Sequence, residues 1–232
     1  MSANKTALVV RGGWPGHRPV EATELFIPYL EANGYDVRVE ESTAVYADGA
    51  YLAGVDLILQ SVTMSTIEVD EFRGLRAAVE AGTGFAGWHG GIADSFRNTS
   101  DYLHLVGGQF GCHPGKHPFP HNEDETDAFV PYTVEISETG KTHPITAGIA
   151  DFDLVTEQYW VLADSYSTVL ATTTQKRRDF DPWHREVVHP AVWTREWGRG
   201  RVFVATPGHS LDVLQDSSVK TIIERGMLWA SR

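Results

Sequence analysis

Cysteine is almost absent from this sequence. Cys112 is the one cysteine among 232 residues, so the chain cannot form an internal disulfide. This usage is compatible with a reducing compartment. The opening residues, MSANKTALVV, lack a long apolar core followed by a cleavage site, so we expect no signal peptide. No apolar run approaches the roughly 20 residues of a membrane span, and we therefore expect a cytoplasmic protein that makes no membrane contact.

Clustered positive charge is also lacking. The chain has 19 basic and 31 acidic residues, a formal net charge of -12. The densest basic run is KRR at residues 176–178, and Asp179 and Asp181 follow it at once. Nucleic-acid binding needs a basic face, so we expect no nucleic-acid partner. The acidic balance mainly favours solubility.

The N-terminal part of the chain alternates between buried-strand and helix patterns. Strands are expected at 6–13, 35–42, 55–62 and 83–88. A helix over 19–34 would end at Gly34, and a second would begin with a capping box of Ser65 and Glu68 and end at Gly82. This alternation favours a parallel sheet with helices on both sides. The length favours one large α/β domain spanning residues 1–232.

The second half has a different pattern. Residues 107–127 are rich in glycine, proline and histidine, which predicts a loop, and long ordered loops in compact domains are often functional. Segments 128–137, 153–163 and 167–174 have strand patterns and are expected to be antiparallel. Residues 189–210 predict a hairpin around 198–200 that returns to a buried strand at 202–205. Residues 218–232 predict a terminal helix.

The stretch GFAGWHGG, residues 84–91, places His89 at the tip of a glycine-flanked turn after a buried strand. In many α/β enzymes such a turn presents a nucleophilic serine or cysteine. Ligands bind at the carboxyl edge of open α/β sheets, so His89 is a candidate acid–base group, metal ligand or hydrogen-bond donor to a sugar hydroxyl. Trp88 could stack on a sugar face. Simple packing remains the alternative for both residues.

Two further histidines follow expected strands. His17 comes after RGGWPG and opens the first helix, and His209 lies in TPGHS, just after the strand at 202–205. Helix N-termini offer free N–H groups that suit anions. Trp14 beside His17 could also stack on a sugar. We therefore expect His17, His89 and His209 to gather along one rim of the sheet, with capping, surface or packing roles as the alternatives.

Three stretches together carry a family resemblance: RGGWPGH, GWHGGIADSFRNTSDYLHLVGGQFGCHP and PAVWTREWGRGRVFVATPGHS, joined by KTHPITAGIADFDLVTEQYW. The chain resembles the ThuA-like (trehalose utilisation) family of the class I glutamine amidotransferase-like superfamily. The resemblance implies a flavodoxin-like parallel sheet flanked by helices, with an added β-rich segment, and a link to bacterial sugar catabolism. His113 matches the family's His-Pro motif, and Glu157 and Tyr159 match its acid-x-Tyr pattern.

The chain departs from the superfamily's enzymes at the turn itself. Amidotransferases place a cysteine there, activated by a histidine, whereas this chain has His89. Thioester chemistry with glutamine therefore finds no nucleophile at that position. His113, His117 and His121 are spaced by four, but prolines at 114, 118 and 120 exclude a regular helix, and the spacing is not a zinc motif. We expect His117 and His121 to lie in a solvent-exposed loop.

Three hypotheses follow for the function. The leading one is an enzyme acting on a disaccharide or keto-sugar derivative by histidine acid–base chemistry, as an isomerase, lyase or hydrolase. A second adds a divalent metal, for which zinc suits histidine and glutamate ligands best. A third is a non-catalytic sugar-binding or regulatory module. A homo-oligomer is compatible with the sequence, and a small-molecule carbohydrate is the expected partner.

These hypotheses assign roles to the same set of residues. The catalytic candidates are His89, His209 and Glu157. The substrate-binding candidates are His17, Trp14, Trp88, His113 and Tyr159. The metal-ligand candidates are His89, His113, His209 and Glu157.

Overall fold

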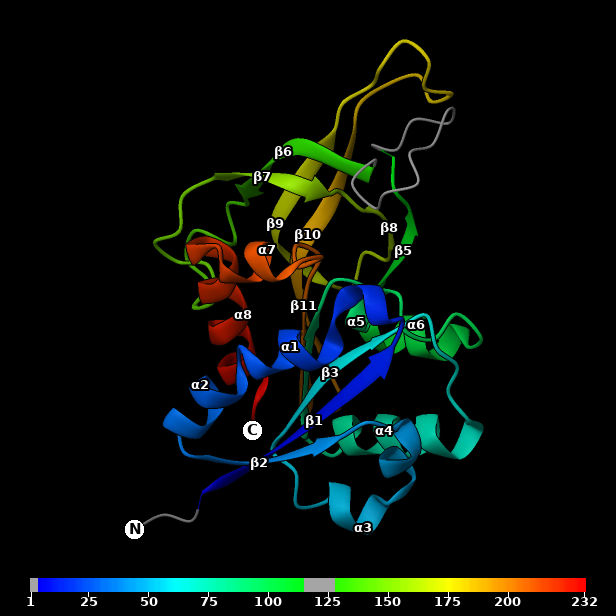
Figure 1. Cartoon of the computed structure of the whole chain (residues 1–232), viewed down its shortest axis with the longest axis vertical. Helices are drawn as coiled ribbons and strands as arrows, with labels where there is room; N and C mark the ends of the chain where they lie inside the picture. Colours follow the sequence, from blue (N-terminus) through cyan, green and yellow to red (C-terminus); the bar gives the residue numbers. More distant parts are fainter. Residues whose placement is uncertain (1–3, 115–127) are drawn as a thin grey trace.

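A mixed β-sheet forms the centre of the molecule (Figure 1). The computed structural model describes residues 4–114 and 128–232, and within these residues the sheet has nine strands in the order β2-β1-β3-β4-β11-β10-β9-β6-β7. The first five strands in that order are parallel. Their bounds are β1 Lys5–Gly13, β2 Tyr35–Glu40, β3 Leu57–Thr63, β4 Gly84–Trp88 and β11 Gly200–Ala205.

Helices cover both faces of this parallel part (Figure 1). In β1, Ala7 and Val9 pack toward one helix layer and Leu8 and Val10 toward the other. Burial on both faces explains why the strands are continuous apolar runs in the sequence. One layer contains α1 Pro19–Glu24, α2 Ile27–Ala32, α7 Leu211–Gln215 and α8 Ser217–Ala230; the other contains η2 Thr43–Ala47, α3 Gly49–Leu52, α4 Val69–Glu80, α5 Gly90–Ala93 and α6 Ser100–Val106.

The second half of the chain extends the sheet with antiparallel strands. These are β6 Phe129–Ile136, β7 Phe152–Glu157, β9 Thr168–Gln175 and β10 Val187–Trp197, with β10 and β11 forming the expected hairpin. A separate ribbon pairs β5 Gly108–Cys112 with β8 Trp160–Ala163. The predicted fold, a flavodoxin-like parallel sheet flanked by helices with an added β-rich segment, is confirmed.

The structure corrects four details of the predicted elements. The loop expected over 107–127 begins with a strand, because residues 108–112 form β5 and pair with β8. The helix expected over 19–34 is split into α1 and α2, because Pro28 has no N–H to continue the first helix's hydrogen bonds. The capping box of Ser65 and Glu68 is wrong: α4 begins one turn later, where the Glu68 backbone N–H donates to the Glu71 carboxylate (3.1 Å).

The fourth correction matters for the site. The strand expected over 153–163 ends at Glu157 and restarts at Trp160 in the other sheet. Between them, the buried Gln158 side chain donates to Thr173 Oγ1 of β9 (3.1 Å), so the chain leaves the main sheet at this point. As a result, Glu157 and Tyr159 lie at a strand end rather than within a strand. Across residues 4–114 and 128–232, no helix is both long and apolar enough to cross a membrane.

Candidate functional site

The turn that carries His89 connects β4 to α5 and has a strained backbone. His89 has φ 49° and ψ -143°, a conformation uncommon for a residue with a side chain. Its backbone N–H donates to the Ala205 carbonyl of β11 (2.7 Å). From the other side, the buried Gln60 side chain of β3 donates to the Gly91 carbonyl (3.2 Å). These bonds hold the turn against both neighbouring strands and present the imidazole at the carboxyl edge of the sheet.

Positive φ is concentrated at this edge. Within the described residues, the non-glycine residues with positive φ are Arg18, Met64 and His89. They lie in the turns that follow β1, β3 and β4, which are adjacent in the sheet. Backbone strain of this kind persists only where the surrounding structure fixes it, and it often gathers at functional sites.

Four side chains meet at this edge, from four separate parts of the chain. His17 follows β1, His89 follows β4, Glu157 ends β7 and His209 follows β11. Each offers one nitrogen or oxygen atom, and these atoms all lie within 4.8 Å of one another. The imidazole ring centroids are 4.7 Å apart for His17 and His89, and 5.1 Å apart for His17 and His209. We call these four residues the His–Glu cluster.

Glu157 is the centre of the cluster. Its Oε2 lies 3.0 Å from His89 Nε2 and 3.0 Å from His209 Nδ1, and its Oε1 lies 3.5 Å from His113 Nε2. Burial acts to raise the pKa of Glu157, but the contacts with His209 and His89 outweigh it and hold that pKa well below the usual range. Glu157 is therefore an ionised carboxylate, although only 7% of it is exposed.

His89 has a defined tautomer. Its Nδ1 lies 2.8 Å from the Thr206 carbonyl, which can only accept, so Nδ1 carries a proton. The other ring nitrogen, Nε2, lies 3.0 Å from Glu157 Oε2 and 2.8 Å from the Tyr159 hydroxyl. Burial lowers the pKa of His89, and the Glu157 contact opposes that shift in part. Burial likewise raises the pKa of Tyr159, which stays a neutral phenol.

His17 is the member of the cluster nearest to solvent. Its Nδ1 lies 2.9 Å from Thr63 Oγ1, at the end of β3. Burial and then repulsion from His89 and His209 lower the pKa of His17 to about 2. Its imidazole is therefore neutral at physiological pH, with one ring nitrogen occupied by Thr63.

The remaining candidates from the sequence have different positions. His113 is 25% exposed and lies beside Glu157, and Tyr159 contacts His89 directly. The half-buried Trp14 ring stands edge-on to His17, with centroids 4.8 Å apart. Trp88 lies outside the cluster: it is 2% exposed and packs on Phe26, so it has no free face for a sugar. His117 and His121 lie outside the described residues.

Sequence reasoning missed the residues that support the cluster. Thr63 and the Thr206 carbonyl each hold one imidazole nitrogen. The Tyr132 hydroxyl donates to the Glu157 carbonyl (3.2 Å), and the Phe129 ring lies 5.2 Å from His209. Only Thr63 had a usable signal, because it ends a buried strand of the same sheet as His17 and His89.

A cavity of about 270 Å³ adjoins the cluster. His17, His209 and Phe129 line it together with the polar side chains Arg18, Ser210 and Asp212. The volume is near the lower end for small-molecule sites, and hydroxyl-rich ligands suit its mixed polar and aromatic lining. Glu157 and His89 lie behind His209 and His17, outside this lining.

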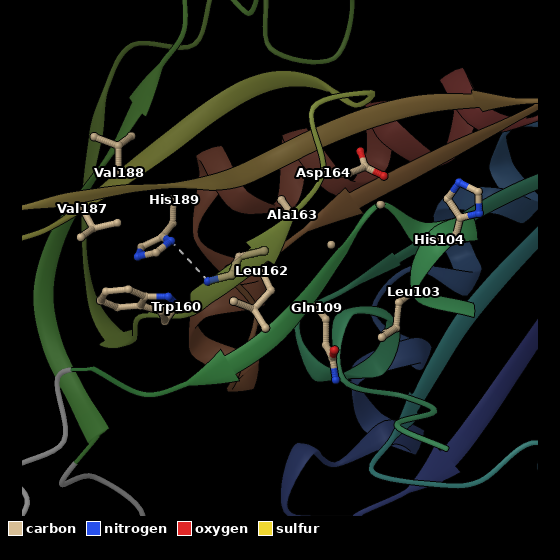
Figure 2. A pocket seen from close by; sticks show the side chains of 13 residues that line it. Leu103, His104, Gln109, Trp160, Leu162, Ala163, Asp164, Val187, Val188 and His189 are labelled. Carbon is tan, nitrogen blue, oxygen red and sulfur yellow. Dashed lines mark hydrogen bonds between the residues drawn. The ribbon is translucent and has the colours of Figure 1, made fainter. Parts of the chain in front are cut away.

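A second cavity, of about 640 Å³, is separate from the cluster. Figure 2 shows His189 and Trp160 at one end of it and Asp164 and His104 at the other. His189 accepts a hydrogen bond from the Val161 backbone N–H (3.4 Å). No member of the His–Glu cluster lines this cavity, so it is not part of the candidate site.

Comparisons with known proteins agree with the fold. The family model ThuA, described as trehalose utilisation, matches residues 6–230. A search of curated proteins finds no match. A protein of Bacteroides uniformis described as ThuA-like is 18% identical, with a TM-score of 0.73 over 97% of this chain and 91% of that one. One from Parabacteroides merdae is 16% identical, with a TM-score of 0.71 over 99% and 90%. A cytoplasmic protein of Salmonella typhimurium is 15% identical, with a TM-score of 0.63 over 98% and 100%.

Proposed function

We propose a function from one premise: the chain belongs to the ThuA family, described as trehalose utilisation, which its family model matches over residues 6–230. The protein is an enzyme of sugar catabolism that acts on a disaccharide or its oxidised (keto) derivative. Its reaction takes place at the His–Glu cluster. The single cysteine fits a reducing compartment, and we assign the enzyme to the cytoplasm.

One observation carries this proposal. Three imidazoles and one carboxylate, delivered by four different strand ends, lie within 4.8 Å of one another beside a cavity. Structural packing rarely gathers so many titratable groups, and perturbed pKa values in a cleft are typical of catalytic sites. The carboxyl edge of an open α/β sheet is also where such folds bind ligands.

The cluster suits chemistry at a carbonyl or at the carbon beside it. A keto sugar can lose a proton from the carbon next to its carbonyl. Return of the proton at another position gives isomerisation; alternatively the glycosidic C–O bond breaks, a C=C bond forms and the second sugar takes up a proton and leaves as an alcohol. That step needs a group that takes up the proton and a group that stabilises the oxygen as charge develops. The imidazoles of the cluster and the ionised Glu157 carboxylate can supply both functions. Cysteine-dependent amidotransferase chemistry has no support, because Cys112 is exposed on β5 and the turn carries His89.

The test is a substrate screen with matched variants. Trehalose, other disaccharides and their 3-keto forms are incubated with the full chain, and products are followed by NMR. Glu157→Gln and His89→Ala should each reduce turnover by about 10²–10⁴-fold, the usual range for lost acid–base assistance. The exposed His184→Ala serves as the control and should retain full activity. Full turnover by both cluster variants would show that the reaction does not occur here.

A sugar-binding module without turnover is the second candidate, because His89 is only 1% exposed. A substrate atom could touch His89 only if neighbouring side chains moved. Saturable binding of a disaccharide, combined with no product from any sugar or keto sugar in the screen, would favour this candidate over the enzyme.

A further inference from the structure

We propose that the His–Glu cluster is a binding site for one divalent cation of the zinc class, with His17, His89, Glu157 and His209 as its ligands. This inference rests on the proposed function only in placing the reaction at the same cluster. The contacts of the four side chains support the binding itself.

His89 and Glu157 place two potential metal ligands side by side. The Nδ1–H of His89 donates to the Thr206 carbonyl (2.8 Å), which turns Nε2 toward the centre of the cluster. There Nε2 lies 3.0 Å from Glu157 Oε2 and 2.8 Å from the Tyr159 hydroxyl. A nitrogen and a carboxylate oxygen this close are placed so that one cation could bind both.

The Nδ1 atom of His209 is buried and has no hydrogen-bond partner, although it lies only 3.0 Å from Glu157 Oε2. The nitrogen is therefore close to the carboxylate oxygen without the alignment that a hydrogen bond needs. His209 is 5% exposed, so water does not readily solvate this atom. An unpartnered buried nitrogen directed at a carboxylate is the arrangement expected of a metal ligand.

Oxygen atoms hold two of the imidazole rings in place. Metal-binding histidines usually donate the N–H of their second ring nitrogen to an oxygen, which fixes the orientation of the ring. His89 does this with the Thr206 carbonyl at 2.8 Å, and His17 does it with Thr63 Oγ1 at 2.9 Å. In each case Nε2 is the ring nitrogen left on the other side; at His89 it lies beside Glu157 Oε2 and the Tyr159 hydroxyl, which a bound cation would displace from Nε2. A cluster of side chains that served only for packing would not need both of these oxygen contacts.

The donor set also fits zinc better than magnesium or calcium. Imidazole nitrogens suit zinc, whereas magnesium and calcium prefer oxygen ligands. In a tetrahedral zinc site with bonds of about 2.1 Å, neighbouring donor atoms lie about 3.4 Å apart. The two separations of 3.0 Å around Glu157 Oε2, and the 4.8 Å limit for the whole set, bracket that value. Small side-chain shifts would complete the coordination.

Bound there, the cation would lie next to the cavity that His17 and His209 line. It could polarise a carbonyl or hydroxyl oxygen of a sugar derivative entering from that side. The burial of His89 then ceases to be an obstacle, because a metal ligand does not need to touch the substrate.

The probe is the metal alone. The full chain is stripped with a chelator, dialysed, and titrated with Zn²⁺ by calorimetry and with Co²⁺ by visible absorption. We expect one ion per chain and a cobalt spectrum without thiolate bands. His17→Ala, His89→Ala, His209→Ala and Glu157→Gln should each weaken binding by about 100-fold or more, since even outer-shell changes give 10–100-fold losses.

Two controls keep the test decisive. The exposed His184→Ala and Cys112→Ser should bind Zn²⁺ like the wild type. If a cluster variant fails to fold by circular dichroism, Thr63→Val tests the same site from outside the ligand set and should weaken binding about 10-fold. Absence of stoichiometric binding by the wild type, or unchanged affinity in all folded cluster and Thr63 variants, would overturn the proposal.

The two proposals fail separately. Zinc binding at the cluster without turnover of any sugar leaves the metal site standing and rejects the enzymatic function. Turnover of a sugar by a protein that binds no Zn²⁺ does the opposite: it rejects the metal site and leaves histidine acid–base chemistry in place.

Discussion

Replacing Gly90 by alanine tests how closely the His–Glu cluster is packed. Gly90 follows His89 at the start of α5. A Cβ at this position would lie 2.6 Å from His17 Cε1 and 2.9 Å from Thr63 Cγ2. Ordinary carbon contacts are about 3.5–4.0 Å, so both side chains would have to move by about 1 Å. The shift would also break the hydrogen bond between His17 Nδ1 and Thr63 Oγ1 (2.9 Å).

The expected effect has two parts. Overpacking of a well-packed region typically costs about 1–3 kcal/mol, and we expect a loss of this size in the free energy of unfolding. Displacement of His17 should also weaken Zn²⁺ binding by at least about 10-fold, because it disturbs a ligand together with its support. The backbone at Gly90 does not have positive φ, so the effect isolates the steric contact.

Urea unfolding and zinc calorimetry measure the two parts. Gly49→Ala is the matched control, because a Cβ there meets no heavy atom within 4 Å. Its free energy of unfolding should stay within about 0.5 kcal/mol of the wild-type value. If Gly90→Ala matches the wild type in both stability and zinc affinity, then His17 and Thr63 do not pack against the turn as described, and the reasoning fails.

Three further predictions test other parts of the account. Cys112→Ser should retain full turnover of any substrate identified, because the thiol is exposed on β5 and outside the cluster; lost turnover would point to thiol chemistry. Glu157→Asp, which shortens the carboxylate by one methylene, should bind zinc more tightly than Glu157→Gln in competition with a chelator; equal affinity would argue against a carboxylate ligand. Burial lowers the pKa of His189. Below about pH 6.5 the imidazole therefore binds a proton in the unfolded chain but not in the folded one, and the folded state loses stability as the pH falls. The free energy of unfolding of His189→Asn, measured by urea titration, should therefore fall less than that of the wild type between pH 7.5 and 5.5. The two slopes should differ by at most about 1.4 kcal/mol per pH unit, and identical slopes would contradict the burial of His189.

The strand ends were the most predictable part of the site. Each of His17, His89 and His209 follows an apolar run and has glycine close to it in the turn, and parallel strands bring such ends to one edge. Their proximity in the structure follows from that topology. Glu157 was different, because it was suggested by a family resemblance and its strand was expected to continue to residue 163. The break at Gln158 depends on a contact with β9, which periodicity cannot reveal.

The supporting contacts and the direction of Trp88 could not be predicted. A backbone carbonyl such as that of Thr206 leaves no trace in the sequence, although it fixes the tautomer of His89. In β4 both faces are buried, so the alternation of polar and apolar residues that would tell one face from the other is missing. Trp88 shares its face with Ala86 and packs into the core, whereas the strained backbone at His89 turns the next side chain to the edge.

The most direct test of the central claim is a crystal structure of the zinc-loaded protein with anomalous scattering at the zinc edge. The account predicts one peak per chain at bonding distance, about 2.1 Å, from Glu157 Oε2 and from nitrogens of His17, His89 and His209. A peak at Cys112 or on the surface, with the four side chains apart from one another, would contradict it.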